Sequence, residues 1–299
     1  SSIKHDFIGN PVVADSNYVY YGSEDFNIAD NGSENVKSDL ESDNKRAREI
    51  YENNKDILQL VNKENRAGEE PPELVSICKG RLKISAEAYD SLKQMLKAAA
   101  DDGYSYWLAS GYRDWKKQQQ LVNEDVRKNI KSGMSEGDAL AETLKETAPA
   151  GFSEHQTGLA IDLALTSDNI DFIRPDFPYT GICQTFRELS SQYGFIERYP
   201  QKKESITGIA HEPWHFRYIG VPHAEIMKKN DLCMEEYIPF IKQFAYGEQK
   251  YNFTVAQKNF SVSYLPASEA EIVCIEIAED VSYTISGNNI DGYIITEWR

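Results

Sequence analysis

Two short motifs in this chain carry side chains that bind divalent metals. The first reads SEHQTGLAID from Ser153 to Asp162, and the second reads EPWH from Glu212 to His215. Together they offer two imidazoles and a carboxylate as ligands, with a further carboxylate beside one imidazole. Catalytic zinc is held by three such ligands and keeps a position for water, whose proton a nearby free carboxylate accepts. The sequence therefore predicts a catalytic zinc site with a single ion per chain.

The second motif also permits a different interpretation. Residues 211–215 read H-E-x-x-H, which in zincins lies on a helix with both histidines on one face. Pro213 would then sit inside that helix, where it removes a hydrogen bond and costs about 3 kcal/mol. Residues 214–218 alternate bulky apolar with polar side chains, which is the period of a strand. We favour a strand, and the zincin alternative would take a downstream carboxylate as its third ligand, either Glu235 or Glu236.

The elements that position these side chains follow from the same periodicity. Residues 159–165 alternate large and small apolar positions, which predicts a strand with Asp162 on its small-residue face. His155 precedes Gly158, so we expect it on the turn that leads into this strand. His215 and Arg217 should share one face of the second strand, since their spacing is even.

In a regular strand, the side chain of Glu212 would point away from the metal, because its odd offset from His215 puts it on the other face. Pro213 cannot complete the hydrogen-bond ladder, so the strand is expected to start or kink there. Such a kink would turn Glu212 back toward the metal.

Three motifs in a fixed order now resemble a known family. The pattern S-x-H-x-x-G-x-A-x-D at 153–162, E-x-x-H at 212–215 and S-G-Y-R at 110–113 is similar to the VanY-type zinc D-alanyl-D-alanine carboxypeptidases. These are relatives of the VanX dipeptidases, in the superfamily that includes lysostaphin and the hedgehog signalling domain. The resemblance spans roughly residues 60–244, and it is weaker at 64–72, where this chain is more acidic.

The resemblance implies a role for each matching residue. The zinc ligands would be His155, Asp162 and His215. Glu212 would act as general base and then as acid, and Arg113 would stabilise the developing oxyanion. The residues implied to contact substrate or to shape the wall of the site are Ser153, Gln118 and Trp214.

Three further side chains have alternative interpretations. Taken alone, Arg113 fits a solvated loop or a salt bridge as well as it fits a functional role, but its place after a predicted strand favours function. His223 follows a proline at a predicted helix start, so we expect it to be structural. His211 would orient Glu212 or substrate rather than bind the metal.

The implied function is a zinc-dependent D,D-carboxypeptidase that hydrolyses the terminal D-Ala of peptidoglycan stem pentapeptides ending in D-Ala-D-Ala. A zinc-bound water would attack, with Glu212 as general base. The alternatives are a D,D-dipeptidase, an endopeptidase of the L-Ala-D-Glu type, and a non-catalytic zinc or peptide-binding module. Glu212 and Arg113 argue against the module, which needs neither. The sequence does not distinguish antibiotic resistance from ordinary wall maturation.

Composition restricts the partners and the location. A formal net charge of -16 and a pI near 4.8 argue against nucleic acid, whose phosphates require basic patches. No apolar run of the ~20 residues that a transmembrane helix needs is present, so we expect membrane association only through an anchor absent from this chain. The expected location is the extracellular face of a bacterial cell. The four cysteines are widely spaced, which favours free thiols over a disulfide scaffold.

The order of predicted elements indicates an α+β fold, because helices alternate with non-adjacent strands. We expect a small, mostly antiparallel sheet with flanking helices that carries the zinc cleft. Residues 1–40 read as an acidic flexible tether, 41–246 as the catalytic domain and 247–299 as a small β-rich subdomain. No feature of the sequence indicates an oligomeric state.

Overall fold

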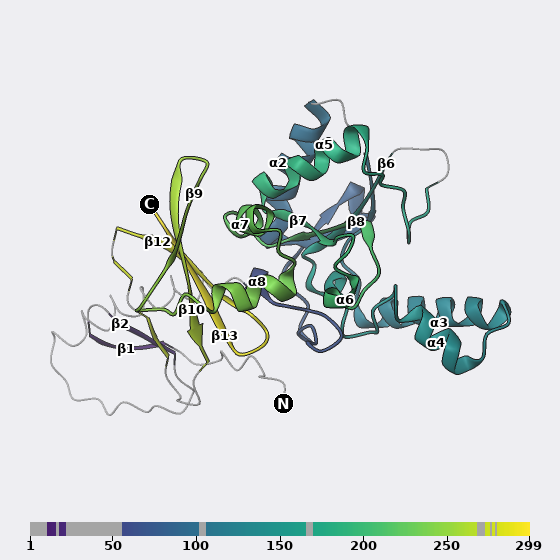
Figure 1. Cartoon of the computed structure of the whole chain (residues 1–299), viewed down its shortest axis with the longest axis horizontal. Helices are drawn as coiled ribbons and strands as arrows, with labels where there is room; N and C mark the ends of the chain where they lie inside the picture. The colour runs from purple at the N-terminus through teal and green to yellow at the C-terminus, as the bar shows by residue number, and fades with distance from the viewer. Residues whose placement is uncertain are drawn as a thin grey trace. The chain divides into compact units, whose positions relative to one another are not determined.

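The computed structural model describes residues 11–15, 18–21, 56–101, 106–165, 170–267, 273–275, 277–278 and 280–299 (Figure 1). The chain forms two compact units. One is Leu60–Ile238, and the other combines Ser1–Gln59 with Pro239–Arg299. Most of the segment 1–40 and the start of the predicted catalytic domain lie outside the described residues. The predicted boundaries at residues 40 and 246 therefore stay a proposal.

A four-stranded antiparallel sheet organises the unit Leu60–Ile238. Its strands, in spatial order, are β5 (Tyr106–Ser110), β6 (Ala160–Leu165), β8 (Glu212–Tyr218) and β7 (Phe195–Tyr199). A separate hairpin pairs β3 (Leu74–Ile77) with β4 (Leu82–Ser85). The prediction of an α+β fold with a mainly antiparallel sheet is confirmed.

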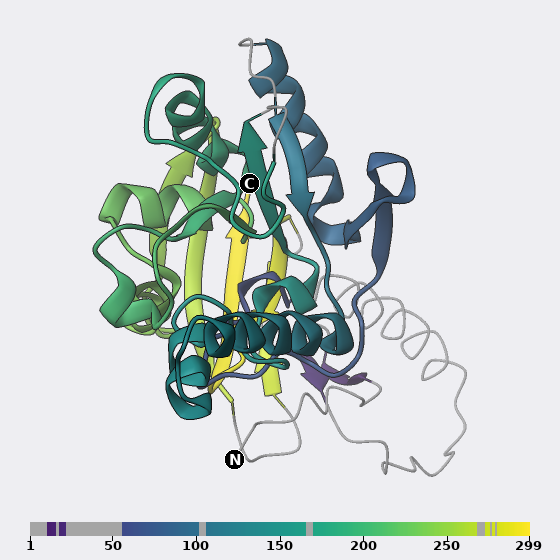
Figure 2. The ribbon, with the colours of Figure 1, turned by 90° about the vertical axis from the view of Figure 1, so that its right-hand side faces the viewer.

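Helices and short turns connect these strands or follow the last of them. They are η2 (Cys78–Gly80), α2 (Ala86–Asp101), α3 (Trp115–Lys131), α4 (Glu136–Thr143), η3 (Glu154–Thr157), α5 (Gly181–Ser190), η4 (Ser191–Tyr193), α6 (Glu204–Thr207), α7 (His223–Asn230) and α8 (Met234–Ile241). Helices α2 and α5 pack against each other, and Figures 1 and 2 show the α3–α4 hairpin well apart from them. Asp114 caps α3 by accepting a hydrogen bond from the backbone N–H of Lys117, at 2.7 Å.

The two faces of the central sheet have different roles. Phe216 on β8 packs edge-on against Phe186 of α5, with ring centroids 5.1 Å apart, and against Phe177 at 5.5 Å. Because successive side chains of a strand point to opposite faces, His215 points away from this aromatic cluster. The α5 side of the sheet is therefore apolar core, and the opposite side is free to carry polar chemistry.

The other unit is rich in β-structure, as the C-terminal sequence predicted. Its antiparallel sheet has the order β12 (Ser282–Gly287), β13 (Gly292–Trp298), β10 (Lys258–Pro266) and β9 (Tyr251–Val255). A second sheet joins β1 (Pro11–Asp15), β2 (Tyr18–Tyr21) and β11 (Val273–Ile275), and a turn, η1, covers Asp56–Leu58. Ile275, Ile285 and Ile295 form a small buried core.

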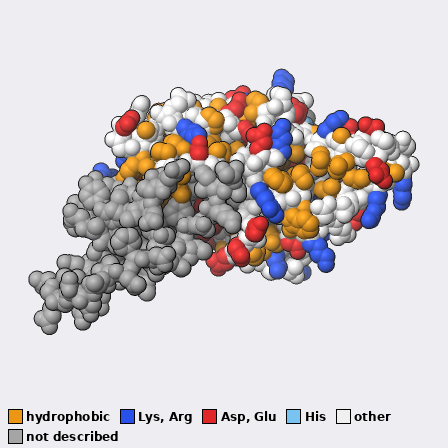
Figure 3. Space-filling view, turned by 90° about the horizontal axis from the view of Figure 1, so that it is seen from below, with side chains coloured by type: hydrophobic (Ala, Val, Ile, Leu, Met, Phe, Trp, Pro, Cys, Tyr) orange, Lys and Arg blue, Asp and Glu red, His pale blue; other side chains and the backbone are white. Residues whose placement is uncertain are grey.

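The surface agrees with the composition. In Figure 3, acidic and basic side chains are interspersed over the described part of the face in view. Among the described residues, no helix combines the length and apolarity needed to cross a membrane.

The thiols of Cys78, Cys183 and Cys233 are free, as predicted for these positions.

Candidate active site

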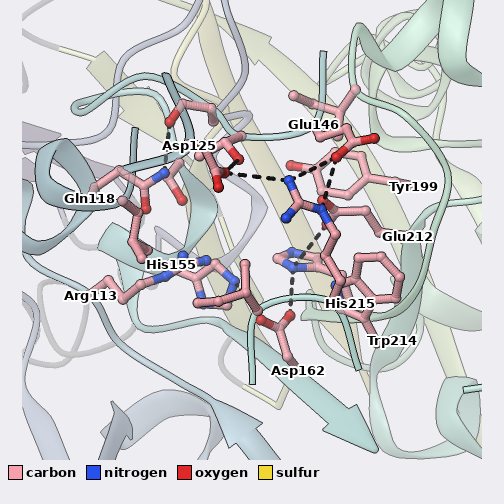
Figure 4. Close-up of a pocket in the computed structure, with 17 residues that line it drawn as sticks. Arg113, Gln118, Asp125, Glu146, His155, Asp162, Tyr199, Glu212, Trp214 and His215 are labelled. Atoms are coloured by element: carbon pink, nitrogen blue, oxygen red, sulfur yellow. Dashed lines mark hydrogen bonds and ion pairs between the residues drawn. The ribbon is translucent and has the colours of Figure 1, made fainter. Parts of the chain in front are cut away.

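Three side chains with metal-binding atoms converge on the polar side of the central sheet (Figure 4). His155 lies on η3, the turn that leads into β6, and Asp162 lies on β6 directly opposite His215 of β8. One ligand atom from each lies within 4.8 Å of the others, and all three residues are buried. Asp162 stands between the imidazoles, with Oδ2 3.3 Å from Nε2 of His155 and Oδ1 3.0 Å from Nδ1 of His215. Two imidazoles and one carboxylate are a donor set that suits zinc.

The pairing of β8 with β7 is irregular beside Glu212. Glu197 of β7 pairs with Phe216, and Tyr199 pairs with Glu212, so two steps along β7 match four along β8. The extra residues include Pro213, where the sequence predicted a kink. The pairing is irregular here, and Oε2 of Glu212 lies 3.7 Å from Nδ1 of His215.

The environment of Glu212 suits proton transfer. Burial raises the pKa of its carboxyl to about 7, an effect that Asp162 increases and that His215 and Arg113 oppose. A carboxyl with a pKa near neutrality accepts a proton and returns it with little cost in either direction. The geometry is therefore that of a general base beside a metal site.

The zincin alternative is wrong. The H-E-x-x-H segment ends on strand β8 rather than on a helix. Its proposed third ligands are engaged elsewhere, since Glu235 forms an ion pair with Arg198 at 2.7 Å and Glu236 one with Lys203 at 2.7 Å.

Arg113 lies where β5 has ended and α3 has not begun. Its backbone N–H donates to the carbonyl of His155 at 3.0 Å, which ties it to the metal-binding turn. Burial lowers the pKa of its guanidinium, and the nearby carboxylates of Asp162 and Glu212 oppose that shift. Its Nε atom is buried without a hydrogen-bond partner among the described residues. Arginine stays charged in proteins, so this is a half-buried cation with unused hydrogen-bonding capacity at Nε.

One pocket brings together all the site residues that the sequence singled out. Its lining includes Arg113, Gln118, Ser153, His155, Asp162, Glu212, Trp214 and His215. Gln118 donates through Nε2 to the carbonyl of Ala148 at 2.7 Å, whereas its Oε1 is buried with no partner among the described residues. That oxygen is available to a ligand N–H.

Sequence reasoning missed a second group in the same pocket. Arg174 donates through Nε to Glu146 at 2.8 Å and lies 3.4 Å from Asp125, and all three line the pocket. The ring of Tyr199 lies 5.0 Å from that of His215. These residues come from separate segments and share no motif, so no local pattern could have grouped them.

The two remaining histidines of the C-terminal half are not among the clustered ligands. His211 stacks on Tyr179 and contacts its hydroxyl at 2.7 Å. His223 is buried with Nδ1 2.6 Å from the hydroxyl of Tyr237, and burial lowers its pKa to about 3. A neutral, enclosed imidazole fits the structural role predicted for His223.

Comparison with known proteins agrees with this site. Residues 81–221 match the family model VanY, described as D-alanyl-D-alanine carboxypeptidase. A crystal structure of the vancomycin-resistance D,D-dipeptidase VanXYg, in complex with a D-Ala-D-Ala phosphinate analogue, is 40% identical with a TM-score of 0.74. The match covers 81% of this chain and 93% of that one. The chain belongs to the VanY family.

Two other VanY relatives extend the comparison. A D-alanyl-D-alanine carboxypeptidase of Enterococcus faecium is 33% identical over 214 residues, which cover 71% of this chain and 61% of the relative's length. A VanY D,D-pentapeptidase variant from a VanB-type resistance cassette, solved with Zn(II), is 34% identical with a TM-score of 0.55, and 62% of this chain covers 99% of it. The predictions of VanY membership, of a metallopeptidase and of a zinc cofactor are confirmed.

Proposed function

We propose that this enzyme is a D,D-carboxypeptidase that removes the terminal D-Ala from peptidoglycan stem pentapeptides ending in D-Ala-D-Ala. The observation that carries the proposal is one pocket that holds the carboxyl of Glu212, the His155–Asp162–His215 cluster and the half-buried Arg113. The names of the E. faecium carboxypeptidase and of VanXYg support the choice of substrate. We propose that it acts at the extracellular face of a bacterial cell, where peptidoglycan lies.

Each residue of the site has a separate role in the reaction. Zinc, which His155, Asp162 and His215 would hold, supplies Lewis acidity and lowers the pKa of water. Glu212 accepts a proton from the attacking water at its carboxylate and later delivers it to the leaving amine. The guanidinium of Arg113 stabilises the negative charge that develops on the carbonyl oxygen of the scissile bond.

Other pocket residues would orient the peptide. Gln118 presents its unpartnered Oε1 to a substrate N–H. Ser153 and Trp214 line the same pocket, and we propose that they contact the substrate or shape its wall.

The test is incubation of the zinc-loaded chain with a stem pentapeptide ending in D-Ala-D-Ala, followed by mass analysis. We expect loss of one D-Ala, and no loss after treatment with a chelator. Free D-Ala-D-Ala is a useful second substrate, because the VanXYg neighbour is a D,D-dipeptidase. Release of a dipeptide, or an internal cut, would replace the carboxypeptidase assignment. Zinc-loaded protein that cleaves neither substrate would favour the binding module.

Arg113→Lys is expected to lower kcat by about 10²–10³-fold, with little change in zinc content. Lysine keeps the positive charge but loses the planar fork of donors that can face a developing oxyanion. Steady-state kinetics on the pentapeptide measures the effect. Arg81→Lys is the matched control, because Arg81 is exposed and does not line the pocket. Equal kcat values for the two variants would remove Arg113 from the mechanism.

A further inference from the structure

Glu154 lies one residue before His155 and is only 1% exposed. Its two carboxylate oxygens have different partners. Oε1 accepts hydrogen bonds from Nε of Arg198 at 2.7 Å and from Nη1 of Arg217 at 2.6 Å. Oε2 lies 3.3 Å from Nε2 of His215. One oxygen therefore neutralises buried cations, while the other faces an imidazole of the metal site.

The two imidazoles of the site present opposite nitrogens to Asp162. In His155, Nδ1 lies 2.7 Å from the carbonyl oxygen of Gly111. A carbonyl only accepts, so the proton of a neutral His155 is on Nδ1 and the lone pair of Nε2 faces Asp162. In His215 it is Nδ1 that faces Asp162, and Nε2 faces Glu154.

We propose that Glu154 is a positioning residue that accepts the Nε2–H of His215 and so directs the lone pair of Nδ1 toward the metal. A neutral imidazole carries a single N–H, so a carboxylate on one nitrogen fixes which nitrogen binds. The inference rests on the proposed role of His215 as a ligand. It adds a residue that lies inside the first sequence motif but to which the motif gave no function.

The surroundings of Glu154 hold this carboxylate in place. Arg198 is itself clamped by Glu235, through Nη1 to Oε2 at 2.9 Å and Nη2 to Oε1 at 2.7 Å. The guanidinium groups of Arg198 and Arg217 both donate to this carboxylate, which neutralises its charge and fixes its orientation. Glu154 thus remains an acceptor. A purely structural ion pair would not require the second oxygen to be directed at His215.

Glu154→Gln in the full chain tests the inference through zinc affinity, measured by competition with a chromophoric chelator. The amide oxygen can still accept from both arginines, which turns the NH₂ group toward Nε2 of His215. The NH₂ group of the glutamine and the Nε2–H of His215 are then two donors that face each other. This favours the other tautomer of His215, in which Nδ1 bears the proton. We expect zinc affinity to fall about 10- to 100-fold, the effect typical of losing such a partner.

Glu235→Gln is the control, since it removes the same charge from the same ion network without touching His215. We expect it to lower thermal stability and to keep wild-type zinc affinity. Wild-type affinity in Glu154→Gln, or equal losses of affinity in the two variants, would overturn the inference.

Imidazole ¹⁵N NMR of the zinc-loaded wild-type chain gives a second test that needs no variant to fold. We expect His215 to carry its proton on Nε2 and the metal on Nδ1, and His155 to show the reverse. Zinc bound through Nε2 of His215 would overturn the role of Glu154 and leave the proposed function intact. Wild-type protein that binds no zinc would overturn both.

Discussion

Glu212→Gln is expected to lower kcat on the stem pentapeptide by about 10²–10⁴-fold, the range found when a general acid–base group is lost. Glutamine keeps the shape of the side chain but cannot accept a proton from water or return one to the leaving amine. Because Glu212 contributes no atom to the clustered ligand set, zinc content should stay at one ion per chain. KM should change much less than kcat, since the loss falls on the transition state.

The measurement is a full kinetic comparison of Glu212→Gln with wild type, alongside zinc analysis of both proteins. Glu204→Gln provides the control, as Glu204 is an exposed carboxylate on α6 just before the same strand. We expect that variant to match wild type. A Glu212→Gln enzyme within a few-fold of wild-type kcat would eliminate this residue as the base.

Removal of the metal is expected to abolish activity completely and to lower stability. Any ligand that binds only the folded chain stabilises it by RT ln(1 + [L]/Kd), which reaches about 4 kcal/mol at a free concentration of a thousand times Kd. Zinc should therefore raise the melting temperature of chelator-treated protein and restore its activity. We expect this effect on stability because the donor atoms of His155, Asp162 and His215 lie together in one buried cluster.

His155→Ala and His211→Ala separate a ligand from a neighbour in this experiment. We expect His155→Ala to lose both the activity and the zinc-induced rise in melting temperature. His211 stacks on Tyr179 outside the ligand cluster, so His211→Ala should keep the zinc response. Loss of that response in His211→Ala alone would require a different ligand set.

The parts of the site that could be predicted are those that depend on residues close together in the sequence. The alternation around Asp162 and the glycine after His155 were enough to indicate a strand and its entry turn. Pro213 was enough to suggest that Glu212 leaves the regular alternation. Even spacing placed Arg217 on the face of His215, and both contact Glu154.

The parts that could not be predicted depend on contacts between distant segments. Arg198 and Arg217 are fully buried, although charged side chains are ordinarily exposed and sequence alone favours that state. Their burial makes sense only once Glu154 and Glu235 are brought to them by the fold. In the same way, the sequence predicted that residues 247–299 are rich in β-structure but carried no information that β11 pairs with β2, more than two hundred residues earlier.

The register shift in β8 also bears on protein design. The carboxylate and the imidazole of the E-x-x-H motif come together where the pairing of β8 with β7 is irregular, with two residues more on β8 than on β7 over that interval. A designer who grafts this motif onto a regular hairpin would obtain the correct letters with Glu212 directed into the opposite layer. The motif should therefore be transferred together with its irregularly paired strands, because the four residues alone do not specify the geometry.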